Sequence, residues 1–278
     1  MSEPEWRRVN RAKWDERVPL HLKSLLHYDQ TELRAGRGRI DPIEAAVLGP
    51  IGGMRILHLQ CHFGMDSLAL AQCGAFVTGV DFSAPAIDAA RELAGELGLA
   101  DRSRFVVSDV YETAFALAEP DSFDRVFVSW GALCWLPDIA GWARVVAHHL
   151  KPGGWLALAE AHPTAYVFDS LTADADGRPG WWVPYFGREP MIEDRPDDYA
   201  DPSAILQNTR THEWLHPLSD VIAALLDAGL TLKRFSEHDA VPWQMFDCLL
   251  RSEDRFYRWP DRPWLPLSYS LQAEKPRA

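Results

Sequence analysis

The chain has 278 residues, of which 47% are apolar and 24% charged, and its net charge is −12 at neutral pH. This composition is that of an ordinary globular protein with a sizeable core, built as one domain with a large insertion or as two small domains. The acidic balance repels phosphate backbones, so we expect no nucleic-acid partner.

The cysteines and the apolar runs bear on the compartment. None of the four cysteines has CxxC spacing, and no signal-peptide pattern stands at the start of the chain. We therefore expect reduced thiols in a cytoplasmic protein. No apolar run approaches the roughly 18 residues that span a bilayer, so we expect no membrane partner.

Two helices are expected before the first strand. Apolar residues from Trp14 to Leu25 recur at helical spacing with charges between them, which predicts an amphipathic helix over residues 5–28. Asp41, which is followed by a proline, is a typical helix start, and this second helix is predicted to end near Gly49.

The next stretch has the layout of a nucleotide-binding unit. An apolar strand over 55–60 runs into a tight turn that ends at Gly64, and a helical segment and a second strand over 76–81 follow. Asp81 lies 17 residues after Gly64, a spacing suited to accepting hydrogen bonds from ribose hydroxyls. Only the last glycine of a GxGxxG pattern is present, and the rest of the chain does not continue as a dehydrogenase, which disfavours an NAD site.

Strands and helices continue to alternate as far as residue 160, which predicts an α/β fold with a parallel sheet and helices on both faces. Residues 163–215 break the alternation and are rich in proline, glycine, aspartate and aromatic residues, as is typical of a functional insertion. The other expected elements are helices over 84–97, 138–150 and 218–228, a turn over 151–154, and strands over 104–108, 123–128, 155–159, 230–238 and 264–273.

This pattern divides the chain into four parts. We expect a helical cap over 1–50, an α/β core over 51–162, a substrate-pocket insertion over 163–216 and a completion of the sheet over 217–278.

Four short motifs, in order and correctly spaced, resemble those of class I S-adenosylmethionine-dependent methyltransferases. They are LHLQCHFG at 57–64, VDFS at 80–83, SDV at 108–110 and LKPGG at 150–154. The resemblance implies S-adenosyl-L-methionine as cofactor and no metal. It also implies a Rossmann-like, seven-stranded, mostly parallel sheet with helices on both faces, an N-terminal helical cap and an insertion after strand five.

More narrowly, the phrases LHLQCHFG, VTGVDFS, WGALCWLPD and EAHP are similar to those of a bacterial small-molecule subfamily. Some of its members methylate carbon 3 of indole in tryptophan-derived alkaloids. The resemblance thus implies a small aromatic substrate, with carbon methylation of an indole as the narrowest expectation. O- or N-methylation of another small molecule, or cofactor binding without turnover, are the alternatives.

The resemblance also implies where the cofactor lies. Asp81 is expected at the ribose and Asp109 at the adenine amino group, while closure of the first helix brings Arg17 to the ligand carboxylate. His58 stands where the family has an acid, so the residue that faces the ligand ammonium stays open. The expected cofactor-binding residues are Trp14, Arg17, Gln60, Cys61, Gly64, Asp81, Phe82, Ser83, Asp109, Val110 and Ser129.

Methyl transfer to a group that loses a proton requires a base. Glu160 and His162 lie two apart at the end of an expected strand, so their side chains share a face, and a carboxylate beside an imidazole raises its pKa and orients it. We predict these two residues and Tyr28 as catalytic. A structural role for His162 is the alternative, and His62 is a second candidate base.

Twelve tryptophans are an unusual number. We expect them either to line a ligand pocket or to pack an irregular second layer. Trp130 follows the fourth strand, where it would stack on an aromatic acceptor or plug the loop. The expected substrate-binding residues are Trp130, Trp135, Trp182, Tyr185 and Glu213.

The segment His212–His216 reads HEWLH and matches a zinc-protease motif literally. Such a site needs a helix, whereas the upstream QNTRT favours a strand, so a metal-dependent hydrolase is the weakest alternative. The tryptophan-bearing N-terminal helix would also suit a homodimer contact.

Overall fold

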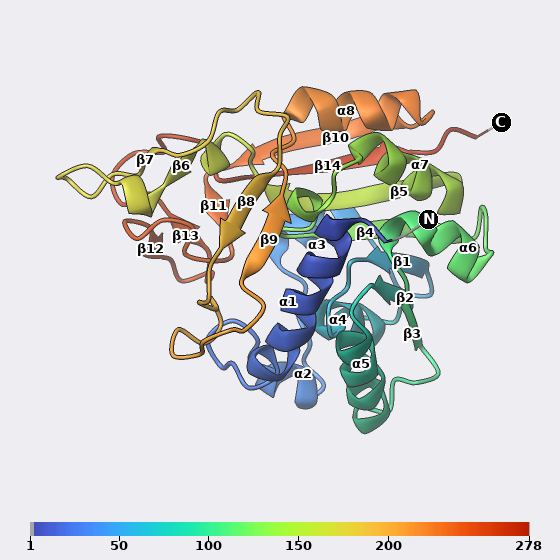
Figure 1. The fold of residues 1–278 in the computed structure, drawn as a ribbon. Coiled ribbons are helices and arrows are strands. Elements are labelled where there is room, and N and C mark those ends of the chain that lie inside the picture. Colours follow the sequence, from blue (N-terminus) through green and yellow to red (C-terminus); the bar gives the residue numbers. More distant parts are fainter. Residues whose placement is uncertain (1–2, 278) are drawn as a thin grey trace.

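The computed structural model describes residues 3–277 and is built around one seven-stranded sheet (Figure 1). The strand order is β10-β14-β5-β4-β1-β2-β3. The pairs that β14 makes with β10 and β5 are antiparallel, and the other pairs are parallel. The strands are β1 (Arg55–Leu59), β2 (Phe76–Asp81), β3 (Ser103–Val107), β4 (Phe123–Ser129), β5 (Leu150–Ala161), β10 (Thr231–His238) and β14 (Ser268–Glu274).

Helices cover both faces of this sheet, as predicted, because strand side chains alternate between two apolar layers. Leu57 and Leu59 of β1 lie in one cluster with α6, α7 and α8, whereas Ile56 lies in a second cluster with α3 and α4. The helices are α3 (Pro42–Leu48), α4 (Met65–Gln72), α5 (Ala84–Glu96), α6 (Thr113–Leu117), α7 (Ile139–His149) and α8 (Leu218–Asp227).

The turn predicted at 151–154 is part of β5, so the predicted start of that strand at 155 is wrong. Phe123 pairs with Leu150, and the next pair along β4 joins Arg125 to Trp155. The extra residues form a bulge in which Gly153 has a φ of 83°. Glycine adopts this left-handed conformation at little cost, and so the strand continues through the bulge.

The first helix is shorter than predicted. Helix α1 (Glu5–His21) ends seven residues before Tyr28; Pro19 lies inside it, and the hydrogen bond from the N–H of Leu22 to the carbonyl of Val18 continues the helical pattern past the proline. The chain then turns through residues 22–28 and forms α2 (Thr31–Arg34) before α3. Figure 1 shows α1 across the edge where β1 and β4 end.

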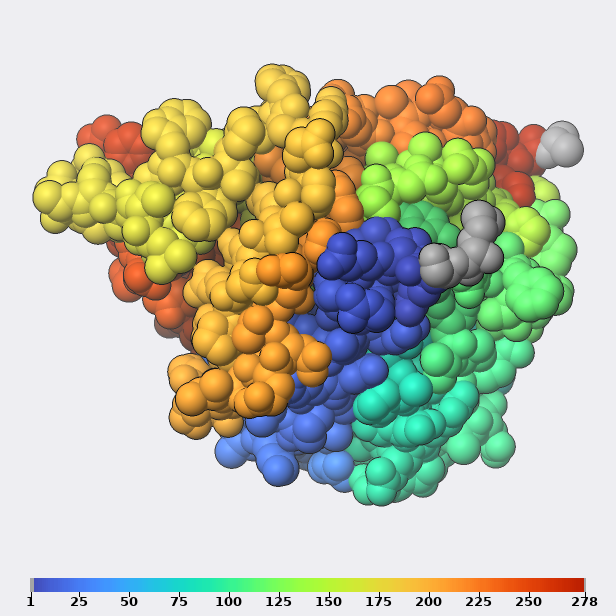
Figure 2. Space-filling view, in the orientation of Figure 1, coloured from blue at the N-terminus to red at the C-terminus, as the bar shows by residue number. Residues whose placement is uncertain are grey.

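The insertion and the C-terminal part carry short sheets, of which the sequence pattern indicates only the strand that the QNTRT segment enters. Strands β8 (Met191–Asp194) and β9 (Arg210–Glu213) pair beside α1, and Figure 2 shows α1 filling the surface between this hairpin and the core. The other short elements are β6 (Phe168–Asp169), β7 (Gly180–Trp181), β11 (Ala240–Val241), β12 (Leu250–Arg251), β13 (Tyr257–Arg258), η1 (Val110–Glu112), η2 (Leu133–Trp135), η3 (Ala165–Val167) and η4 (Ser170–Thr172).

Within residues 3–277, no helix combines the length and the apolar character that crossing a bilayer demands.

Candidate functional site

In the turn between β1 and α4, residues with side chains as well as glycine adopt left-handed backbone conformations. Gln60, His62 and Gly64 have φ values of 57°, 49° and 76°. A Cβ atom at Gly64 would lie 2.6 Å from the ring of Phe105, so only glycine fits there. Cys61 is buried, and its backbone N–H donates to Val80. The replaced glycines of the motif therefore leave the turn intact.

Gln60 spans the mouth of this turn. Its amide Nε2 donates to the carbonyl of Ala132 after β4, across 2.8 Å. Its Oε1 atom is buried and has no hydrogen-bond partner within residues 3–277. A buried acceptor without a donor is costly, so this oxygen is suited to a ligand's N–H group.

Asp81 ends β2 beside the turn, as predicted. One carboxylate oxygen accepts from the backbone N–H of His62 and the other from that of Ser83, each at 2.9 Å. Burial raises the pKa of Asp81 to about 6. Each oxygen keeps a lone pair for a further donor, so the carboxylate can accept hydroxyl groups as well.

Asp109 lies at the neighbouring strand end. It accepts from the backbone N–H of Tyr111 at 2.9 Å, and Arg7 of α1 lies 2.9 Å from its other oxygen. Burial raises the pKa of Asp109. The following Val110 is buried, and Phe82 and Ser129 are half-buried at the ends of β2 and β4. These residues share the carboxyl edge of the sheet, as predicted.

Helix α1 covers this edge through polar contacts. The side chain of Asn10 donates to the carbonyl of His212 and accepts from its N–H, so it extends the edge of β9. Lys13 is buried, and its ammonium donates to the carbonyls of Arg195 and Thr209 at 2.9 and 3.0 Å. The helix is thus fixed to the insertion on its outer side.

A chain of charged and imidazole side chains leads from α1 to the turn. The Asp198 carboxylate lies 3.1 Å from Arg17 Nε and 3.2 Å from His21 Nε2. His21 Nδ1 lies 2.9 Å from His62 Nε2. Arg17 therefore pairs with Asp198, a partner within the chain that was not predicted.

These hydrogen bonds fix the tautomers of the His21 and His62 rings. Because His21 donates from Nε2 to Asp198, its Nδ1 must accept, and His62 therefore donates from Nε2. The lone pair of His62 is then on Nδ1, which has no hydrogen-bond partner within residues 3–277. Desolvation lowers the pKa of both rings, so both are neutral at pH 7.

Aromatic side chains surround these two imidazoles. Tyr28 stacks on His21 with ring centroids 4.8 Å apart, and its hydroxyl bonds to that of Tyr199. Trp14 packs edge-on against His62 and against Trp135, each at 5.3 Å. Trp14 and Tyr28 thus both lie at the turn. Their predicted roles in cofactor binding and catalysis stay predictions.

The predicted pair of Glu160 and His162 is not formed. Glu160 is buried and accepts from four backbone N–H groups, of which three belong to residues 131–133, so it fixes the loop after β4. His162 Nε2 lies 3.0 Å from Glu237, and its Nδ1 accepts from the N–H of Thr164. Strand alternation places Glu160 and His162 on one face. However, nearby backbone N–H groups bind the Glu160 carboxylate, and the Glu237 carboxylate binds the His162 ring.

Two of the predicted substrate residues lie at the inner edge of the insertion and the β4 loop. Trp130 has a φ of 42° and packs edge-on against Trp243 and Phe256. Glu213 is on β9 near Lys13, and desolvation followed by the charge of nearby Glu193 raises its pKa to about 7. A carboxyl group of this kind exchanges protons readily at neutral pH.

Trp182 and Tyr185 lie farther out. They line a separate cavity of about 400 Å³. The Tyr185 hydroxyl accepts from the N–H of Leu218 at 3.1 Å, which ties the insertion to α8. Their predicted role in substrate binding stays a prediction.

Three neighbouring carboxyl groups, Asp41, Glu44 and Asp66, were not predicted as residues of the site. Desolvation and the neighbouring Asp41 raise the pKa of Asp66 to about 6. Burial, then Asp66 and Asp41, raise the pKa of Glu44, and the hydrogen bond from the backbone N–H of Asp41 offsets part of this. The available signal was Asp66 itself, an acid at the second position of the helix that follows the LHLQCHFG motif.

His58 cannot supply this negative charge. Burial lowers its pKa to about 3, so the ring is neutral, and its Nδ1 lies 2.8 Å from Ser67 Oγ. Around residues 212–216, His216 Nε2 donates to the carbonyl of Leu136 at 2.7 Å. No group of three or more metal-ligating side chains is placed to hold an ion in the part of the chain that the structure describes.

Comparison with known proteins gives a consistent picture. Residues 56–154 match the family model of a methyltransferase domain. An O-methyltransferase of ubiquinone biosynthesis from Paracidovorax citrulli is 33% identical over 121 residues, which are 44% of this chain and 49% of that protein. A demethylmenaquinone methyltransferase from Clavibacter sepedonicus is 34% identical over 137 residues, 48% of this chain and 53% of that protein. The chain thus spans about half the length of these curated relatives.

Among solved structures, an S-adenosylmethionine-dependent methyltransferase from Mesorhizobium loti has a TM-score of 0.58 and 24% sequence identity, and the match covers 84% of this chain and 96% of that one. This likeness and the strand order give the chain the Rossmann-like fold of class I S-adenosylmethionine-dependent methyltransferases, as predicted.

Proposed function

We propose that the protein transfers a methyl group from S-adenosylmethionine to a small aromatic molecule. The observation that supports this most is the buried Asp81 carboxylate, aligned by backbone N–H groups beside the left-handed turn at Gly64. Ligands of doubly wound sheets bind at this carboxyl edge. The methyltransferase-domain match over 56–154 contains both the turn and the acid.

The residues of the edge fit the cofactor. Asp81 accepts from ribose hydroxyls, and the unpartnered Oε1 of Gln60 accepts from the ammonium group. Asp66, whose pKa is about 6, is ionised at neutral pH and adds the negative charge that the neutral His58 lacks. Once bound, S-adenosylmethionine supplies an electrophilic methyl group on a positively charged sulfur.

The protein's own part is to orient the acceptor and to remove its proton. We assign the base role to His62, since its ring is neutral and its Nδ1 lone pair is available beside the turn. His21 and Asp198 hold the ring in that tautomer. His162 is less suited, because both of its ring nitrogens have partners.

The narrow form of the proposal is carbon 3 of an indole. Trp14 and Trp135 offer flat apolar surfaces near His62, which suits an aromatic ring. Removal of the indole N–H proton by His62 would raise the electron density at carbon 3. The name of the ubiquinone-biosynthesis relative favours O-methylation of a small molecule as the runner-up.

Calorimetric titration with S-adenosylhomocysteine tests the cofactor assignment. The wild-type protein is expected to bind it, and Asp81→Ala to bind about 10- to 100-fold more weakly, since ribose hydroxyls lose a buried acceptor. Asp81→Asn, which keeps one acceptor, should lie between them. The exposed Asp88→Asn serves as a control. Absence of binding by the wild type would refute the proposal.

A transfer assay with methyl-labelled cofactor then separates the acceptors. Indoles, phenols and amines are offered in parallel, and the labelled atom of the product is identified by mass spectrometry and NMR. Binding of the cofactor without transfer to any acceptor would leave a binding protein instead of an enzyme.

A further inference from the structure

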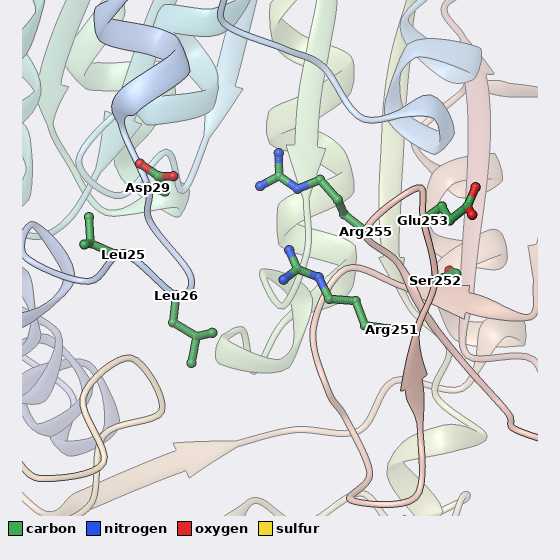
Figure 3. Close-up of a pocket in the computed structure, with 7 residues that line it drawn as sticks. All are labelled: Leu25, Leu26, Asp29, Arg251, Ser252, Glu253 and Arg255. Carbon is green, nitrogen blue, oxygen red and sulfur yellow. The ribbon is translucent and has the colours of Figure 1, made fainter.

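A second cavity lies between the end of the cap and the C-terminal three-stranded sheet (Figure 3). Its volume is about 640 Å³. One wall comes from the segment after α1 and the other from the turn between β12 and β13. The lining residues are Leu25, Leu26, Asp29, Arg251, Ser252, Glu253 and Arg255.

Two of these residues present guanidinium groups without partners. Neither Arg251 nor Arg255 has a carboxylate oxygen within 4.0 Å in the described range 3–277, whereas Arg258 of the same hairpin pairs with Asp254 at 2.7 Å. In Figure 3 both arginines reach across the cavity toward the cap, and Glu253 points away from them. Asp29 lines the same cavity, and its charge interacts with that of Arg255, but it lies beyond ion-pair distance. In a chain of net charge −12, two neighbouring cations without a carboxylate in contact are a local exception that suits an anion.

The turn that carries the arginines is held in an unfavourable shape. Arg255 has a φ of 75°, a conformation that residues with side chains seldom adopt. Its N–H donates to the carbonyl of Ser252, and Ser252 Oγ donates to Asp254 at 2.7 Å. Such conformations persist where the surroundings require them, often at ligand sites.

The opposite wall combines apolar surface with a link to the catalytic residues. Leu25 and Leu26 are 78% and 62% exposed, so they offer contact area to a ligand. Tyr28, in the same segment, packs against His21 and His62 at the cofactor turn. Tyr28, two residues after Leu26, thus connects the wall of the cavity to the proposed base.

We propose that this cavity is an acceptor subsite in which Arg251 and Arg255 bind a carboxylate and Leu25 and Leu26 contact the apolar part next to it, while the aromatic ring lies toward Trp14 and Trp135 as proposed above. The inference rests on the proposed function, and it narrows the acceptor to an aromatic acid. A neutral isostere lacks the charge-assisted hydrogen bonds and binds more weakly.

Calorimetry with indole-3-acetate and its neutral analogue indole-3-acetamide tests the subsite. The full chain is expected to bind the acid at least tenfold more tightly than the amide, and 0.5 M NaCl should reduce that preference. The double variant Arg251→Gln/Arg255→Gln should lose the preference. Arg144→Gln, at an exposed position on α7, is the matched control and should keep it. Circular dichroism checks that each variant is folded.

The same samples are titrated with S-adenosylhomocysteine, which separates the two proposals. Binding of S-adenosylhomocysteine with no binding of indole-3-acetate, with equal affinities for acid and amide, or with a preference retained by the double variant overturns the subsite alone. Binding of the acid by the arginines without binding of S-adenosylhomocysteine leaves the anion site standing and overturns its role in methyl transfer.

Discussion

The central sheet and the cap helix α1 are held in the protein by opposite kinds of contact. The sheet is packed by apolar clusters in which Trp142 and Leu158 are fully buried. Helix α1 has apolar contacts at Trp14 and Val18, but it also buries Asn10, Lys13 and Arg17, which it holds by hydrogen bonds and ion pairs. Apolar burial supplies stability, whereas buried polar pairs add little net stability but penalise any other placement. The polar contacts therefore determine where α1 lies but contribute little to the free energy of unfolding.

Trp142→Ala tests the sheet side of this comparison and should have the largest effect. Removing a fully buried indole from α7 is expected to cost about 3–5 kcal/mol in the free energy of unfolding. Urea denaturation followed by circular dichroism measures it. Trp142→Phe, which keeps most of the ring, should lose much less, and equal losses would argue against a cavity effect.

His62→Asn tests the point where the cap meets the turn. Asparagine tolerates the left-handed backbone at this position, but it cannot act as a base. Turnover should fall about 100-fold with little change in affinity for S-adenosylhomocysteine. The exposed His148→Asn should behave as wild type.

Asp198, which holds His21 and through it His62, offers a second test of the proposed base. Asp198→Asn keeps the shape of the residue but removes the charge that fixes His21, so turnover should fall about tenfold. If His62→Asn retained full turnover, the base would have to be sought elsewhere, with Glu213 as the next candidate.

Asn10→Ala tests the cap side. The backbone N–H and carbonyl of His212 lose their partner, which should cost about 1–2 kcal/mol. Hydrogen exchange should accelerate in α1 and β9 but not in β4 or β5. Arg8→Ala, an exposed change on the same helix, is the control. Uniform acceleration across the sheet would show that cap and core open together.

The pH dependence of cofactor affinity is the smallest expected effect. Burial raises the pKa of Asp81 to about 6, so the free protein holds a proton there at lower pH. Ribose binding favours the ionised carboxylate, and affinity should therefore rise by up to about tenfold per pH unit below 6 and level off above it. Calorimetry from pH 5 to 8 measures this. Asp81→Asn should flatten most of the slope, and Asp66 accounts for the remainder.

The sheet was predictable because its signals are local. Apolar alternation marks the strands, and the distance from Gly64 to Asp81 follows from one βαβ unit. The end of α1 was missed because Pro19 lies inside the helix and no glycine or proline directly follows His21. The KPGG turn was read as a strand boundary because a bulge and a loop share the same residues.

The site was only partly predictable, because its partners are far apart in the sequence. His21 meets Asp198 across 177 positions, and no periodicity reports such a contact. The pairing of Glu160 with His162 followed from strand geometry alone, yet backbone N–H groups two to four residues beyond β4 hold the carboxylate. Main-chain donors in irregular loops leave no trace in a residue pattern.

Arg7 of α1 binds Asp109, and Asp15 of α1 accepts from Ser83 Oγ at 2.6 Å. The residues expected to touch the nucleoside are thus the ones that hold the helix down. Exchange of a nucleoside at this edge would then require α1 to move away from the sheet. The residence time of the nucleoside would be set by the rate at which α1 opens, whatever the strength of the nucleoside's own contacts.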